Sequence, residues 1–288
     1  MEISTRLVRR LLTAQFPQWA GLPLGSAGSA GRDNVIYRLG ADLAVRLPRR
    51  ALGAAHVERE HRWLPLLAPH LPLPVPVPLG RGVPGEGYPW HWSVCRWLPG
   101  EIAAAEPVAD PGEAATALAG FIAALRAVDP AGGPGSEFRG VPLAARDADV
   151  RAAVGALDGV VDPVPVLAAW QAAMAAPVWR GHGVWMHGDL HPANLMVDRG
   201  RLSGVLDFGL AAVGDPACDL MVAWTFVTAP ARERFRAALP VGEAAWARAR
   251  GWALDFGLMC AARAPGDPVM GGIGRRTVRE VAADQAIC

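Results

Sequence analysis

Hydrophobic and polar side chains alternate along two short segments near the start of the chain, residues 34–40 and 43–49. Such alternation places successive side chains on opposite faces of a β-strand. The Gly-Ala-Asp at their junction is typical of a turn, so the two segments predict a β-hairpin. Residues 89–98 are again strand-like. Residues 71–80 contain too many prolines for a central strand and therefore predict an extended connection.

A helical spacing replaces this alternation over residues 55–70, where Val57, His61, Leu64 and Leu67 recur three or four positions apart. Residues with that spacing lie on one face of an α-helix. This segment therefore predicts one helix within the β-rich first part of the chain.

Three later segments open with Asp-Pro and continue with a mostly apolar helical pattern: residues 110–129, 162–175 and 215–228. Aspartate is a favoured N-cap residue, and proline is favoured at the first helical position. The pattern predicts a helix in each segment, with the opening aspartates Asp110, Asp162 and Asp215 as caps.

The pattern changes from mostly strand-like to mostly helical near Gly100. It predicts an α+β fold with two lobes. A small β-rich lobe with one helix occupies residues 1–99, and a larger, mostly helical lobe occupies residues 100–288. The chain length of 288 residues and the hydrophobic content of 52% are sufficient for such a fold.

The chain contains no apolar stretch of the roughly 18 residues that a membrane-spanning helix needs. Its N-terminal segment lacks the features of a signal peptide. The 4 cysteines show no CxxC spacing, so neither a zinc site nor a disulfide framework is expected. We therefore expect a reduced cytoplasmic protein that does not associate with membranes.

All 28 basic residues are arginines, and 12 of them lie in the first 100 residues against 6 acidic ones. The rest of the chain carries 16 arginines against 21 acidic residues. This asymmetry indicates two regions with different partners. A basic region could bind nucleic acid, but the aromatic residues near this one resemble strand and core residues. We therefore expect the basic region to bind nucleotide phosphates.

Residues 185–210, WMHGDLHPANLMVDRGRLSGVLDFGL, place polar residues at the ends of short apolar segments. Asn194 follows Asp189 by five positions, and Asp207 begins a DFG sequence. This spacing is the D-x-x-x-x-N and DFG layout of kinases. Phosphoryl transfer needs a carboxylate that receives the acceptor hydroxyl proton and oxygen ligands for Mg²⁺. Asp189 suits the first role, and Asn194 with Asp207 suits the second.

An alternative interpretation is a metal cluster formed by the H-x-D-x-H sequence of His187, Asp189 and His191, which would indicate a metallohydrolase. It leaves Asn194 and the DFG sequence unexplained. We expect instead that His187 braces the loop through a hydrogen bond, and that Asp219 hydrogen-bonds back to the same loop.

The segments MHGDLHPANLMV and GVLDFGLAAVGDPACDLMVAW resemble the aminoglycoside phosphotransferase family of antibiotic kinases, which has a protein-kinase-like two-lobe fold. The resemblance extends over most of the chain. It implies ATP or GTP with Mg²⁺ in the small lobe and a hydroxylated acceptor in the helical lobe. It assigns Asp189 as the catalytic base and Asn194 and Asp207 as metal ligands, with His187, Asp215 and Asp219 as structural support.

The same resemblance implies a nucleotide site in the small lobe. Gly28, Ser29 and Gly31 are expected in a turn over the nucleotide phosphates. Arg46 is the basic strand residue expected there, and Glu60 on the following helix is its expected partner, whereas Glu58 is expected to be solvated. Cys95 is expected at the back of the base pocket, and Arg96, Trp97 and Leu98 in a hinge at about 96–99.

Arg46 is a departure from the family pattern, which has a lysine at this position to grip the nucleotide phosphates. A guanidinium is always charged and can donate two hydrogen bonds to phosphate oxygens, but it is longer and planar. The base and both metal ligands are intact, which indicates an active enzyme that uses Arg46. A nucleotide-binding pseudokinase is the alternative.

The acceptor is not determined by these motifs. Residues 220–288 carry nine arginines against six acidic residues, whereas polycationic aminoglycosides call for an acidic pocket. A nucleoside or macrolide antibiotic is therefore as consistent with the charges as an aminoglycoside. A metabolic kinase for a choline-, sugar- or homoserine-like alcohol is a further alternative. The oligomeric state is left open.

Overall fold

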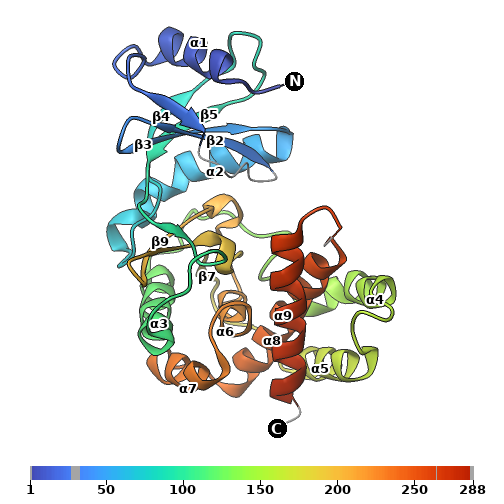
Figure 1. Cartoon of the computed structure of the whole chain (residues 1–288). Helices are drawn as coiled ribbons and strands as arrows, with labels where there is room; N and C mark the ends of the chain where they lie inside the picture. The colour runs from blue at the N-terminus through green and yellow to red at the C-terminus, as the bar shows by residue number, and fades with distance from the viewer. Residues whose placement is uncertain (1, 27–32, 264, 286–288) are drawn as a thin grey trace. The chain divides into compact units, whose positions relative to one another are not determined.

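The computed structural model describes residues 2–26, 33–263 and 265–285. The chain divides into two compact units, which Figure 1 shows with the labels used below. The first unit consists of residues 1–99 together with 204–209, and the second of residues 100–203 together with 210–288. The short segment 204–209, which contains Asp207, thus belongs to the first unit, although it lies far along the sequence.

The first unit is built on an antiparallel sheet with the strand order β1-β2-β3-β5-β4. The strands are β1 (Leu24–Ser26), β2 (Asn34–Leu39), β3 (Leu43–Pro48), β4 (Pro78–Gly82) and β5 (Trp92–Arg96). The predicted hairpin is confirmed: β2 pairs with β3, and Arg46 lies opposite Ile36 on one side and Ser93 of β5 on the other.

The described residues of this unit form two α-helices, α1 (Thr5–Gln15) and α2 (Ala51–Leu67), so the prediction of a single helix is wrong. The side chain of Ser4 caps α1 by accepting a hydrogen bond from Leu7 N. The buried residues of α1 are Leu7, Val8, Leu11 and Leu12. They join the hydrophobic core that the sheet also lines, and this burial gives the short helix its stability.

The second unit is mostly helical. Its helices are α3 (Pro111–Ala127), α4 (Asp147–Ala156), α5 (Pro163–Ala175), α6 (Val222–Thr225), α7 (Ala229–Ala238), α8 (Glu243–Ala262) and α9 (Pro268–Gln285). The predicted caps of α3 and α5 are present, because Asp110 accepts hydrogen bonds from Gly112 N and Glu113 N, and Asp162 accepts one from Val164 N. Helix α8 lies at the centre and packs against α4, α5 and α9.

Two small sheets complete the second unit and hold the loop between residues 187 and 194. Strand β7 (Val184–Met186) pairs with β10 (Ala212–Gly214), and β8 (Leu195–Asp198) lies between β6 (Glu101–Ile102) and β9 (Arg201–Val205). A single 3-10 turn, Pro192–Asn194, leads the loop into β8. In the described ranges, none of the helices is both long enough and apolar enough to cross a membrane.

Candidate functional site

The loop that follows β7 is anchored by Asp219, which lies at the start of a 3-10 turn. The two carboxylate oxygens of Asp219 accept hydrogen bonds from His187 N at 2.7 Å and Gly188 N at 2.8 Å. Gly188 has a φ of +81°, and a Cβ there would lie 2.9 Å from the Leu210 carbonyl oxygen, so only glycine fits. The expected hydrogen bond from Asp219 to the loop is therefore present.

The carboxylate of Asp189 is held by one of its two oxygens. His191 Nε2 and Asn194 Nδ2 each lie 3.3 Å from Oδ2. No residue in the described ranges hydrogen-bonds to Oδ1, and 22% of the side chain is exposed. Burial alone would raise the pKa of Asp189, but the neighbouring His191 holds that pKa well below its ordinary value. The result is an ionised carboxylate with one oxygen that can receive a proton.

Two residues fix the backbone and the amide around Asp189. His187 accepts a hydrogen bond from Asp189 N on its Nδ1 at 3.2 Å, which is the expected bracing bond. Asn194 is buried, and its Nδ2 donates to the Asp189 carbonyl oxygen at 3.0 Å. The amide nitrogen of Asn194 is thus turned toward Asp189, which leaves its amide oxygen as the atom that could bind a cation.

A second group of polar residues lies within the first unit. Arg46 of β3 forms an ion pair with Glu60 of α2, as expected, and its NH2 lies 3.3 Å from Asp207 Oδ1. Both Arg46 and Glu60 are nearly buried, at 11% and 5% side-chain exposure. Burial opposes the charge on Arg46, but Glu60 and Asp207 together raise its pKa above the ordinary value. The neighbouring Glu58 instead contacts Arg81 on the surface.

Asp207 presents a partly exposed carboxylate. Its φ is +59°, and 42% of its side chain is exposed. Oδ1 accepts hydrogen bonds from Arg46 and from Gly209 N, whereas Oδ2 has no hydrogen-bond partner in the described ranges. Gly209 lies against the His56 ring, where a Cβ would approach to 2.6 Å. A carboxylate with one tethered and one free oxygen is suited to binding a divalent cation.

The metal-cluster alternative for H-x-D-x-H finds no support in this geometry. In the part of the chain that the structure describes, no group of three or more His, Cys, Asp and Glu side chains could hold a metal ion. The Nδ1 atoms of His187 and His191 accept hydrogen bonds from Asp189 N and Ala193 N instead.

The other residues expected to contact a nucleotide are only partly described. Gly28, Ser29 and Gly31 lie outside the described residues. Cys95 is buried on β5, and burial raises the pKa of its thiol to about 12, which makes it unreactive. Beyond it, Arg96 N donates to the Val77 carbonyl oxygen. Trp97 N donates to the Asp42 carbonyl oxygen, and Leu98 is buried.

Asp215 does not cap a helix, so that prediction is wrong. The next helical turn begins at Asp219, and Asp215 Oδ1 accepts a hydrogen bond from Ala217 N. The carboxylate forms a buried, two-point ion pair with Arg248 of α8, at 2.6 and 3.0 Å. Arg248 was not identified from the sequence, in which its only signal is a charge within an apolar helix.

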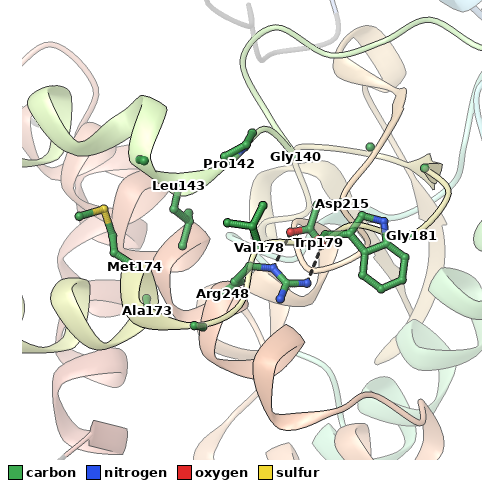
Figure 2. A pocket seen from close by; sticks show the side chains of 14 residues that line it. Gly140, Pro142, Leu143, Ala173, Met174, Val178, Trp179, Gly181, Asp215 and Arg248 are labelled. Carbon is green, nitrogen blue, oxygen red and sulfur yellow. Dashed lines mark hydrogen bonds and ion pairs between the residues drawn. The ribbon is translucent and has the colours of Figure 1, made fainter.

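The Asp215–Arg248 pair lines a cavity of about 230 Å³ in the second unit, which also involves α5 and the segment before β7. Figure 2 shows the pair beside Val178 and Trp179. Arg248 NH1 donates to the Pro177 carbonyl oxygen at 2.7 Å. The cavity therefore combines apolar walls with a closed ion pair and offers no free charge to a ligand.

Replacement of Asp219 by asparagine is expected to destabilise the protein by roughly 1–3 kcal/mol, because an amide can accept only one of the two backbone N–H bonds and leaves the other group unpaired. Urea unfolding followed by tryptophan fluorescence measures this difference. Asp158→Asn, at an exposed position, is the matched control. Equal midpoints for the two variants would contradict the anchoring role of Asp219.

Known proteins share the fold of this chain. Residues 26–252 match the model of the phosphotransferase enzyme family. The GDP complex of a wild-type aminoglycoside 2'-phosphotransferase of type IIIa has a similar structure, with a TM-score of 0.71, 20% identity and coverage of 98% of this chain and 99% of that one. The macrolide 2'-phosphotransferase MphH of Brachybacterium faecium has a TM-score of 0.64 and 26% identity, over 95% and 97% of the two chains.

A curated relative, the uncharacterized protein YcbJ of Bacillus subtilis, is 44% identical over 45 residues. The match spans only 15% of that protein and 15% of this chain. The solved structures confirm the predicted protein-kinase-like fold, and the family match confirms the predicted class of enzyme, a kinase-type phosphotransferase. The chain belongs to the phosphotransferase enzyme family.

Proposed function

We propose that this protein transfers the γ-phosphate of ATP or GTP to a hydroxyl group of an antibiotic. The observation that carries the proposal is the Asp189 carboxylate, which is ionised, held through Oδ2 and open at Oδ1. A carboxylate in this state can orient an acceptor hydroxyl and receive its proton during phosphoryl transfer. The family membership and the similarity to aminoglycoside and macrolide phosphotransferases support the same reaction.

Asn194 and Asp207 would act as ligands for Mg²⁺. Their pairing is taken from the motif spacing along the chain. The amide oxygen of Asn194 and Oδ2 of Asp207, for which the described residues provide no hydrogen-bond donor, fit the hard oxygen ligands that this ion prefers. Bound Mg²⁺ would neutralise charge on the nucleotide phosphates. Arg46 would hold phosphate oxygens through its guanidinium, and Glu60 would keep that guanidinium in place.

The acceptor class is the finer part of the proposal. Structural relatives include enzymes for aminoglycosides and macrolides, so both classes are candidates. The net positive charge of residues 220–288 favours an acceptor with few positive charges. Macrolide and nucleoside antibiotics are therefore candidate acceptors alongside aminoglycosides.

A panel of hydroxylated compounds tests the proposal. ADP or GDP release is measured with each antibiotic class and with choline, sugars and homoserine, and phosphorylated products are identified by mass spectrometry. Asp189→Asn is the inactive control. Turnover with an antibiotic supports the proposal. Turnover only with a metabolic alcohol overturns the antibiotic acceptor, and nucleotide binding without turnover indicates a pseudokinase.

Replacement of Asn194 by alanine is expected to raise the Mg²⁺ concentration for half-maximal activity by roughly 10-fold, because one oxygen ligand is lost. Asp207→Ala should raise it further, since a carboxylate contributes a charge and an amide only a dipole. Initial rates over a Mg²⁺ titration provide the measurement, with Asp158→Ala as control. Activity that EDTA does not change would exclude this assignment.

A further inference from the structure

His191 belongs to the same loop as Asp189, and the proposed reaction leaves it without a role. Its side chain is almost fully buried, with 6% exposed. The ring stacks on Phe256 of α8, with ring centroids 5.0 Å apart and an angle of 26° between the planes. The imidazole is therefore packed against α8 in a buried setting.

The hydrogen bonds of His191 determine which of its nitrogens carries the proton. Nδ1 accepts the backbone N–H of Ala193 at 3.2 Å, so Nδ1 is unprotonated and Nε2 carries the hydrogen. Nε2–H then donates to Asp189 Oδ2 at 3.3 Å. Asn194 Nδ2 lies 3.1 Å from Nε2, but its own hydrogens point to the carbonyl and carboxylate oxygens of Asp189.

The helix beneath the ring is itself fixed by buried charges. Asp255, which precedes Phe256 on α8, accepts a hydrogen bond from Arg139 NH1 at 2.7 Å and is paired with Arg146 at 3.2 Å. Arg139 and Asp255 are almost fully buried, at 1% and 2% side-chain exposure. Arg139 and Arg146 thus pair with α8 at the residue next to Phe256, on which the His191 ring stacks.

We propose that His191 is a positioning residue of the transfer reaction: its Nε2–H holds Oδ2 of Asp189, so that Oδ1 faces the acceptor hydroxyl. This inference rests on the proposed role of Asp189 as the base. It assigns His191 no direct contact with substrate or metal. Phe256 of α8 stacks on the His191 ring, and the ring in turn contacts the Asp189 carboxylate.

Kinetics of His191 variants test the proposal. His191→Phe keeps an aromatic ring for stacking on Phe256 but loses the donor, so kcat should fall about 10-fold with little change in the KM values of nucleotide and acceptor. His191→Gln, which retains an N–H donor, should recover part of the loss. His182→Phe, at an exposed position in the same unit, is the control. An unchanged kcat for His191→Phe would overturn the proposal.

A double-mutant cycle separates positioning from a general structural effect. If His191 acts through Asp189, adding His191→Phe to Asp189→Ala, which removes the carboxylate that His191 contacts, should cause no further loss of the residual turnover. Thermal unfolding of each variant monitors folding. An additive loss would show that His191 acts independently of Asp189.

A measurement without turnover distinguishes this inference from the proposed function. The nitrogen NMR spectrum of the full chain with ¹⁵N-labelled histidine reports the tautomer, and the His191 signal is the one missing in His191→Phe. We expect protonated Nε2 and unprotonated Nδ1, with a changed Nε2–H signal in Asp189→Asn. Protonated Nδ1 would overturn the inference. A panel without any turnover would contradict the proposed function alone.

Discussion

Replacement of Asp189 by alanine is expected to lower kcat by about 10²–10⁴ while nucleotide affinity changes little. The reason is that Oδ1 is open for the acceptor hydroxyl and the carboxylate is ionised, so the variant loses both the proton acceptor and the group that orients the hydroxyl. Steady-state assays of nucleoside diphosphate release give kcat, and calorimetric titration gives nucleotide affinity.

Asp189→Asn is the stricter variant, because it preserves the size of the side chain and can still contact His191. It should lose nearly as much activity as alanine, since an amide oxygen is a far weaker base. Asp158→Asn controls for the loss of an exposed carboxylate. A variant of Asp189 that keeps more than half of the activity would show that another group is the base.

Replacement of Arg46 by alanine is expected to reduce kcat/KM for the nucleotide by about 10²–10³, through both a higher KM and a lower kcat. Both effects arise because phosphate charge is present in the ground state and in the transition state. The change also leaves Glu60 buried without its partner, so folding must be checked by thermal unfolding. Arg81→Ala, at an exposed surface pair, is the matched control.

Arg46→Lys tests whether the site is adapted to a guanidinium. Arg46 contacts both Glu60 and Asp207, two carboxylates that one planar, forked group can reach together. A lysine offers a single ammonium, so we expect activity to fall. Equal or higher activity would show that the site retains the shape for the lysine usual in the family. Unaltered kinetics of Arg46→Ala would show that other residues bind the nucleotide phosphates.

The sequence by itself determined the features that depend on local order along the chain. Strand alternation predicted the β2–β3 hairpin, and Asp-Pro predicted the caps of α3 and α5. The spacing of Asp189, Asn194 and Asp207 predicted a kinase, and the resemblance of the segments around them indicated the family that the match confirms. The Arg46–Glu60 pair could also be predicted, because a strand and the helix that follows it bring these two residues together.

The tertiary structure alone decided the contacts between distant segments. Asp215 meets Arg248 rather than a helix end, and Phe256 supports His191 from a helix far along the chain. Helix α1 is stabilised by burial against the sheet. None of these follows from periodicity, because periodicity indicates which face of an element is buried. The partner of that face is chosen by the packing of the other elements, which minimises exposed apolar surface and unpaired buried charge.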